Sequence, residues 1–348
     1  MQDNQYSLSA DQIRVVATIA VIVLHVSASG VSRLPLDSGA WWLANLLDSF
    51  SRVSIPLFVM LSGALLLHPP LDSVANFYRK RVARIAVPLL LWSLFYSGWT
   101  LLKGEVKHQP VPPSQLLDNL LGGMPYFHLW YLFMLVGLYA ATPLIRWLMM
   151  LLKAAYAPSP SFYLATAVVA STLYTFGFQW FGDGWPWPLW FVGYIPLFML
   201  GAAMWGRPSN QGRLALLAAF VLMVVIIARL AHIQLSEYPA LGAIYSYQYL
   251  SLPVLAASVC AWYLFKRPHQ KLAAYTRFLA PYCFGIYLVH PIFLDISQML
   301  LAKLMFDDIA KMLVQLPLVF GLSLLTCMTY RHTSSKYLKA SLTAQTPH

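Results

Sequence analysis

Charge is scarce in this chain. Only 10% of its 348 residues are charged, against roughly 25% in a soluble domain, and 59% are hydrophobic. Apolar runs of about 20 residues, long enough to cross a bilayer as helices, recur along the sequence. The composition therefore excludes an ordinary soluble protein and indicates an integral membrane protein.

Alternating polar and apolar residues, which a membrane β-barrel requires, are also missing. Runs such as residues 214–227 are continuously apolar instead, and we find no short repeat, soluble domain or low-complexity linker. We therefore expect an all-α polytopic membrane protein, in which residues 1–348 form a single helical bundle and one membrane domain.

Cysteine is rare as well. Cys260, Cys283 and Cys327 all lie in apolar segments without CxxC spacing, so neither a disulfide framework nor a metal site is indicated. The histidines show no Glu-x-x-His or other ligand pair at helical spacing. We predict no bound metal or cofactor. The net charge of +11 is better explained by membrane topology than by a nucleic-acid partner.

The apolar pattern predicts ten membrane spans. They cover approximately residues 13–31, 53–67, 82–102, 125–148, 160–178, 187–205, 213–232, 248–265, 277–301 and 311–330. Val26-Ser27-Ala28 resembles a signal-peptidase site, but the segment before it is poor in positive charge. We therefore expect a retained first helix.

The distribution of Lys and Arg predicts the orientation. With a cytoplasmic N-terminus, sixteen of the twenty-three fall on the inner side, as the positive-inside rule requires. These are Arg14, Arg79, Lys80, Arg81, Arg84, Arg146, Lys153, Arg207, Arg213, Lys266, Arg267, Lys271, Arg277, Arg331, Lys336 and Lys339. We therefore place both termini in the cytoplasm. Aromatic clusters at Trp41-Trp42 and residues 180–190 fall on the outer side, where they can anchor the protein at the lipid boundary or line a carbohydrate site.

Arg14 and His25 are the first candidate functional pair. Eleven helical positions at ~1.5 Å each separate them by roughly 16 Å along the axis, about half the ~30 Å hydrocarbon thickness. Arg14 would then lie at the membrane surface and His25 near mid-depth. Because ionisable groups inside a bilayer are costly, His25 is a functional candidate.

The second candidate is Arg52, within the segment Ser51–Gly63 that we place at the outer end of the second span. The Pro and Ser/Gly pattern of this segment predicts a loosened helix. Arg52 can bind an anionic group or simply form a local helix pair with Asp48, four residues earlier.

Arg81 and Arg84 form the third candidate, in a basic run at the cytoplasmic start of the third span. In a regular helix, residues three apart share a face, and planar guanidinium groups suit phosphate oxygens. The positive-inside rule alone also explains such a run.

Two further intramembrane histidines complete the set. His128 precedes Trp130, and His290 follows Tyr287 by three residues. We expect His25 and His290 in the middle or outer half of the membrane and His128 near the outer surface.

Together these motifs resemble the acyltransferase-3 family of membrane O-acyltransferases over nearly the whole chain. The resemblance is carried by Asp11-x-x-Arg14 with His25, Ser54-Ile-Pro-Leu-Phe58 with Ser62-Gly63, Arg81-x-x-Arg84 before Pro88, His128-Leu-Trp130, and Tyr287-x-x-His290. Val15 departs from the glycine that usually follows the motif arginine in that family.

The resemblance implies an O-acetyltransferase in a bacterial inner membrane. It would move acetyl from cytoplasmic acetyl-CoA to a hydroxyl of a cell-surface glycan or lipid-linked sugar. Arg14 and His25 would then be catalytic and Arg81 and Arg84 would bind the donor, while Arg52, His128, Trp130, Tyr287 and His290 would support the site or the acceptor. The oligomeric state stays open.

The alternative is a transporter or flippase of a lipid-linked or anionic saccharide, with the arginines and histidines lining its path. Transporters often show internal duplication and paired broken helices. The two halves of this chain show no such correspondence, which favours the enzyme.

Overall fold

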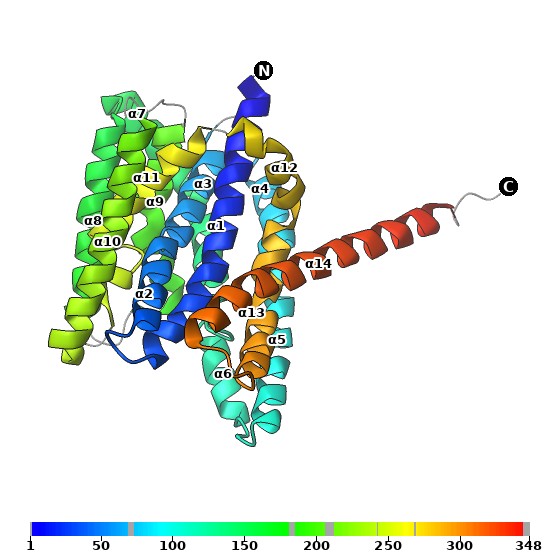
Figure 1. The fold of residues 1–348 in the computed structure, drawn as a ribbon. Coiled ribbons are helices and arrows are strands. Elements are labelled where there is room, and N and C mark those ends of the chain that lie inside the picture. Colours follow the sequence, from blue (N-terminus) through cyan, green and yellow to red (C-terminus); the bar gives the residue numbers. More distant parts are fainter. Residues whose placement is uncertain are drawn as a thin grey trace. The chain divides into compact units, whose positions relative to one another are not determined.

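The computed structural model describes residues 2–68, 73–180, 185–205, 212–241, 243–267 and 269–343, with only the backbone for 2–7, 178–180, 240 and 334–343. The described residues form helices and connecting loops and no strands (Figure 1). The longer helices are α1 (Gln2–Arg33), α2 (Gly39–Ser51), α3 (Ser54–Leu66), α4 (Val74–Arg81), α5 (Val87–Val106), α6 (Pro113–Leu121), α7 (Trp130–Tyr156), α8 (Pro160–Trp180), α9 (Trp190–Trp205), α10 (Arg213–Glu237), α11 (Leu252–Lys266), α12 (Ala273–Leu279), α13 (Cys283–Leu301) and α14 (Asp308–Thr343).

Within the described part of the chain, nine segments are long and apolar enough to cross a membrane. They are Leu8–Arg33, Gly39–Leu66, Val74–Val106, Trp130–Tyr156, Trp187–Trp205, Arg213–Glu237, Tyr245–Lys266, Gln270–Leu301 and Asp308–Thr333. The predicted all-α polytopic membrane fold is thereby confirmed. The predicted span at residues 160–178 coincides with α8, which is not among the nine, so that span stays a prediction.

The second span begins earlier than expected. Ser38 caps α2 by accepting a hydrogen bond from the backbone N–H of Trp41 at 3.1 Å, so the segment is helical from Gly39 and not from residue 53. Helix α2 ends at Ser51, and α3 starts at Ser54. Pro56 accounts for this break, because proline cannot donate to the carbonyl four residues back, here that of Arg52, and its ring clashes there.

Because the second span starts earlier, Arg52 lies deeper within it than the sequence predicts. The sequence placed it at the outer end of a span, whereas the structure places it at the α2–α3 break, thirteen residues into the 28-residue segment Gly39–Leu66. The predicted loosening of the helix around Pro56 is confirmed by the break.

The chain forms two compact units. Unit 1 comprises Met1–Leu57, Gln211–Tyr247 and Ala256–His348, and unit 2 comprises Phe58–Asn210 and Gln248–Leu255. In unit 1, α1 packs beside α2 and α13, and α13 packs against α14 (Figure 1). In unit 2, α9 packs against α7 and α8, and α4 contacts α7.

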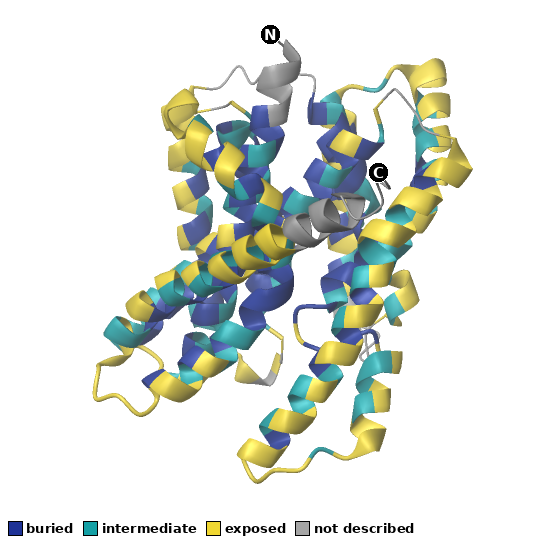
Figure 2. Ribbon diagram, turned by 90° about the vertical axis from the view of Figure 1, so that its right-hand side faces the viewer, coloured by how far each residue is buried: buried dark blue, intermediate teal, exposed yellow. Residues whose placement is uncertain are grey.

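An apolar core surrounds the middle of α1 in unit 1. Ile22 and Val26 pack with buried residues of α13, including Ile286 and Leu294. The outward faces of the helices carry most of the exposed side chains, many of them apolar (Figure 2). Such surfaces suit lipid, and the inward faces can therefore hold polar groups out of its reach.

Candidate active site

His25 and His290 come together in unit 1, although they are 265 positions apart in the sequence. Their rings stack with centroids 5.3 Å apart and planes inclined by 21°. His290 is fully buried, whereas His25 is half-buried and keeps some exposed surface. Of the two residues, His25 is therefore the more exposed.

Pro291 explains how His290 is fixed. Proline has no backbone N–H, so the carbonyl of Tyr287, four residues back in α13, loses its helical donor. The Nδ1–H of His290 donates to that carbonyl at 2.8 Å. Because a carbonyl can only accept, Nδ1 carries a proton and a neutral His290 has its lone pair on Nε2. The motif Tyr287-x-x-His290-Pro291 thus sets the tautomer and direction of the ring.

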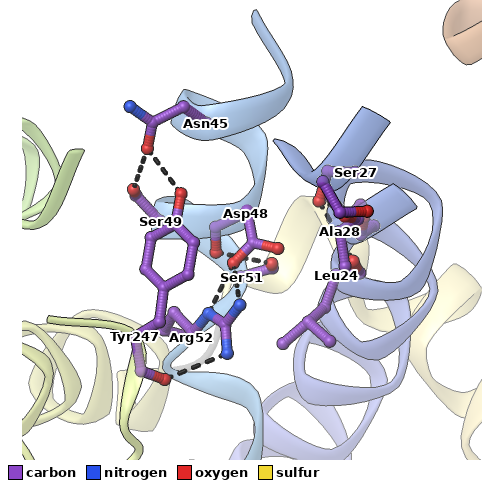
Figure 3. Close-up of polar contacts among 11 residues, drawn as sticks. Leu24, Ser27, Ala28, Asn45, Asp48, Ser49, Ser51, Arg52 and Tyr247 are labelled. Atoms are coloured by element: carbon purple, nitrogen blue, oxygen red, sulfur yellow. Dashed lines mark hydrogen bonds and ion pairs between the residues drawn. The ribbon is translucent and has the colours of Figure 1, made fainter. Parts of the chain in front are cut away.

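Arg52 is held close to this pair by an acid and an aromatic ring. It forms an ion pair with Asp48, which is fully buried. Its Nη1 donates to the carbonyl of Tyr247 at 3.0 Å, and its guanidinium lies 4.2 Å from the centre of the Tyr247 ring (Figure 3). The local Asp48–Arg52 pair considered from the sequence does form, and Arg52 also interacts electrostatically with His25.

A second polar network supports Tyr247. Its hydroxyl donates to Oδ1 of Asn45 at 2.6 Å, and the hydroxyl of Ser49 donates to the same atom at 3.3 Å (Figure 3). Nδ2 of Asn45 donates to the carbonyl of Ala228 at 3.0 Å. Asn45 and Ser49 are completely buried, so this network fixes the ring beneath Arg52.

No sequence motif assigns a role to Asn45, Ser49 or Tyr247. A signal for the first two exists, because Asn45, Asp48, Ser49 and Arg52 follow the i, i+3, i+4, i+7 spacing of one helix face. This pattern can be recognised only if a helix is predicted to start near Gly39, before these residues. Tyr247 lies in a short 3-10 turn far along the chain and carries no local signal.

Arg14 lies on α1 with His25, as predicted. It pairs with Asp11 at 2.5 Å, and about a third of its side chain is exposed. Its carbonyl accepts a hydrogen bond from Thr18 at 2.8 Å. Arg14 is thus separate from the two stacked rings and nearer the N-terminus of the same helix.

Arg81 and Arg84 lie in unit 2, at an irregular turn. Residues Val82–Ala86 form a π-helix, in which the N–H of Val87 bonds to the carbonyl of Val82, five residues back. Pro88 cannot donate to the carbonyl of Arg84, which favours such a turn. The regular spacing on which a shared face was predicted is therefore absent. Arg81 is half-buried, whereas Arg84 is exposed.

His128 and Trp130 also belong to unit 2. His128 is buried, with its ring edge-on to Tyr96 at 4.9 Å and to Tyr126 at 5.9 Å. Trp130 stacks on Tyr249 at 5.6 Å. Both side chains thus contribute to an aromatic cluster, and a role toward the acceptor stays a prediction.

Among the described residues, no three His, Cys, Asp or Glu side chains lie close enough together to hold a metal ion. The three cysteines are free thiols. The candidate site therefore consists of two imidazoles and a fixed guanidinium, groups that suit proton transfer and stabilisation of negative charge.

The long apolar helices of the described residues define a multi-span membrane protein, and the two stacked histidines mark its candidate site. The model of an acyltransferase domain, Acyl_transf_3, matches residues 7–332. The chain therefore belongs to the acyltransferase-3 family, and it is an acyltransferase that transfers acyl groups other than aminoacyl groups. No curated protein and no solved structure matches the chain.

Proposed function

We propose that the protein is an O-acetyltransferase that moves acetyl from cytoplasmic acetyl-CoA to a hydroxyl of a cell-surface glycan or lipid-linked sugar. The observation that carries the proposal is the stacked His25–His290 pair in a chain of the acyltransferase-3 family. Acetyl transfer to an alcohol needs a base that works near neutral pH, and histidine is the side chain suited to that task.

His25 is the proposed base. It accepts the proton of the acceptor hydroxyl as that oxygen attacks the thioester carbon. The C–S bond then breaks, and the proton passes from His25 to the departing thiolate of CoA. His290 holds the first ring in place by stacking, and Arg52 supplies a fixed positive charge near the developing oxyanion.

The same histidine can instead carry the acetyl group as an acyl-imidazole. In that route the side-chain nitrogen attacks the thioester and CoA leaves before the acceptor binds. Incubating purified protein with labelled acetyl-CoA and no acceptor separates the routes, because only the second leaves acid- and base-labile label on the protein.

The acceptor class follows from motif similarity. Ser51–Phe58 and Tyr126–Tyr131 are similar to segments of the inner-membrane enzyme that O-acetylates enterobacterial common antigen. We infer a related lipid-linked or surface saccharide at the outer face of a bacterial inner membrane. The test is transfer of radiolabel from acetyl-CoA to lipid-linked sugar by the purified protein, together with mass spectrometry of surface polysaccharide from cells with and without the gene. Absence of both signals would refute the proposal.

The proposed route also requires that the donor side of the protein faces the cytoplasm. The distribution of Lys and Arg supports this orientation. Single cysteines at Gln109 and Met305, in a background without native cysteines, should react with an impermeant maleimide from outside. A cysteine at Ser159 should not. The reverse pattern would put the donor side on the wrong face of the membrane.

A further inference from the structure

An open groove lies in unit 1 where the start of α13 meets the later turns of α14. Its volume is about 550 Å³, and it is lined by Tyr282, Leu325, Met328, Thr329, Arg331 and His332. Tyr282 immediately precedes α13, and the other five residues belong to α14. The two helices pack against each other (Figure 1). The α14 residues that line the groove are exposed (Figure 2), so a ligand can enter it from outside the protein.

The lining of the groove changes from apolar to basic along α14. Positions 325, 328, 329 and 332 follow the i, i+3, i+4, i+7 spacing of one helix face. Leu325 and Met328 line the earlier part of the groove, and Arg331 and His332 line the later part. A phospholipid has the same polarity, because its acyl chains are apolar and its headgroup carries a charged phosphate.

The basic end of the groove lies at a membrane boundary. Tyr282 precedes a helix of nineteen residues, which at ~1.5 Å per residue is about as long as the ~30 Å hydrocarbon layer is thick. Arg331 lies two residues before the end of the membrane span Asp308–Thr333. The distribution of Lys and Arg predicts that this boundary is the cytoplasmic one.

Tyr282 holds Arg331 in place at the groove. The guanidinium carbon of Arg331 lies 5.5 Å from the centre of the Tyr282 ring. That ring in turn contacts Phe278 of α12, with centroids 5.9 Å apart. A guanidinium that lies over an aromatic ring keeps its N–H donors at the edge of its own plane, where they can bind a phosphate. Arg331 can therefore bind a headgroup without leaving the ring.

The two chain segments that form the groove are strongly basic. Residues 266–282 contain four Lys and Arg, residues 325–348 contain three, and neither segment contains an acid. Helix α1, which packs against α12, carries Asp11, but that carboxylate pairs with Arg14. Basic clusters at the cytoplasmic surface attract anionic lipids. The groove thus matches an anionic lipid in charge as well as in polarity.

We propose that this groove binds an anionic phospholipid of the cytoplasmic leaflet, with its phosphate on Arg331 and an acyl chain along Leu325 and Met328. Soluble phosphates such as CoA offer the same charge but no acyl chain for the apolar part of the groove. The lipid joins Tyr282 to α14 and so stabilises the contact between α14 and α13, the helix that carries His290. Its binding is independent of acetyl transfer.

The test is a titration of phosphatidylglycerol into detergent-purified protein, with thermal unfolding as the readout. A ligand that binds only the folded state raises Tm as its concentration rises. Wild-type protein should therefore be stabilised by phosphatidylglycerol and much less by phosphatidylcholine. Arg331→Gln should need roughly 10- to 100-fold more phosphatidylglycerol for the same rise, the effect of losing a charged hydrogen bond. Equal titrations of wild-type protein and Arg331→Gln would overturn the proposal.

Three further variants separate a site from a general attraction of charge. Lys271→Gln removes an exposed charge from the turn Gln270–Leu272, outside the groove. It should shift the titration less than roughly threefold, because exposed charges contribute little, and a loss as large as that of Arg331→Gln would overturn the proposal. Arg331→Lys keeps the charge without the planar fork and should recover part of the loss. Met328→Trp fills the apolar part of the groove and should weaken binding while Arg331 is intact. An unchanged titration in Met328→Trp would show that no acyl chain enters.

Competition distinguishes the lipid from a soluble phosphate. Inorganic phosphate and CoA should leave the phosphatidylglycerol titration of wild-type protein unchanged. If either one shifts that titration as far as Arg331→Gln does, and has no effect on the variant, the groove binds a soluble phosphate and the assignment to a lipid is wrong.

Discussion

Arg52 in unit 1 and Arg81 in unit 2 are both half-buried guanidinium groups beside a tyrosine ring, but their charges are handled differently. Arg52 is neutralised by the buried carboxylate of Asp48, whereas Arg81 lies among Phe77, Tyr139 and a second arginine. The charge of Arg52 is paired inside the protein, whereas the charge of Arg81 lies against the electron-rich faces of aromatic rings. The two arginines therefore depend on different neighbours for their stability.

The largest expected effect is that of His25→Asn. Asparagine keeps a polar side chain but cannot act as a base at neutral pH, so kcat should fall ~10²–10⁴-fold. Affinity for CoA should not change, because the proposed role of His25 is to accept a proton and not to bind CoA. The measurement is acetyl transfer at matched protein levels in membranes, with CoA binding in parallel.

His290→Asn is the informative control for that change. It removes the stacked ring and the bond to the Tyr287 carbonyl, so a smaller loss is expected than for His25→Asn. Near-normal turnover in His25→Asn together with no activity in His290→Asn would assign the reacting role to His290 instead.

Asp48→Asn tests whether Arg52 depends on its acid. Removing one partner of a buried ion pair leaves an uncompensated charge and costs ~3–5 kcal/mol of stability. The double variant Asp48→Asn with Arg52→Gln should recover part of that loss, because no charge is then left buried. Thermal unfolding in detergent measures both variants, and Arg81→Gln should lower stability less than Asp48→Asn does. Equal losses for Asp48→Asn and Arg81→Gln would remove the distinction between the two arginines.

Gly63→Ala probes the packing of α3 against α9 in unit 2. A Cβ at Gly63 in α3 would lie 1.8 Å from the carbonyl oxygen of Phe198 in α9, so the two helices must shift. The neighbouring hydroxyl of Ser62 lies 3.4 Å from that of Tyr139, on which Arg81 stacks. We expect a loss of ~1–3 kcal/mol in stability, measured by thermal unfolding in detergent.

Gly98→Ala is the matched control, since a Cβ at Gly98 in the α5 helix meets no atom within 4 Å. It should be neutral or slightly stabilising, because alanine is favoured over glycine in helices. An equal loss of stability in both variants would mean that the α3–α9 approach is not the cause.

The sequence was sufficient for the fold class and for the nature of the candidate groups, because both depend on local properties. Long apolar runs require helices in a bilayer, and ionisable residues within them stand out. The start of α2 was misplaced because Asp48, Ser49 and Arg52 look too polar for a membrane helix. In the structure, these side chains form an ion pair and hydrogen bonds within the protein. Local hydropathy does not take such interactions into account.

Long-range contacts and irregular helical turns could not be predicted from the sequence. Tyr247 donates a hydrogen bond to Asn45, which lies 202 positions earlier in the sequence. Arg146 of α7 contacts the ring of Phe77 of α4. Arg146 alone looked like an ordinary inside charge. The π turn between Arg81 and Arg84 changes their relative direction without any distinctive residue. Such features depend on tertiary packing, which apolar periodicity does not encode.

The smallest expected effect is that of Tyr247→Phe, and it tests how the scaffold around Arg52 is built. The substitution removes one hydroxyl hydrogen bond to Asn45, worth ~0.5–1.5 kcal/mol, but it keeps the ring 4.2 Å from the guanidinium. Asn45 still accepts from Ser49. Thermal unfolding should therefore shift slightly, and kcat should fall less than tenfold. Tyr247→Leu removes the ring as well and should cost ~2 kcal/mol more, the value of a desolvated cation–π contact. A loss of kcat in Tyr247→Phe as large as in His25→Asn would show that the hydroxyl takes part in the reaction, because a supporting hydrogen bond is too weak to account for it.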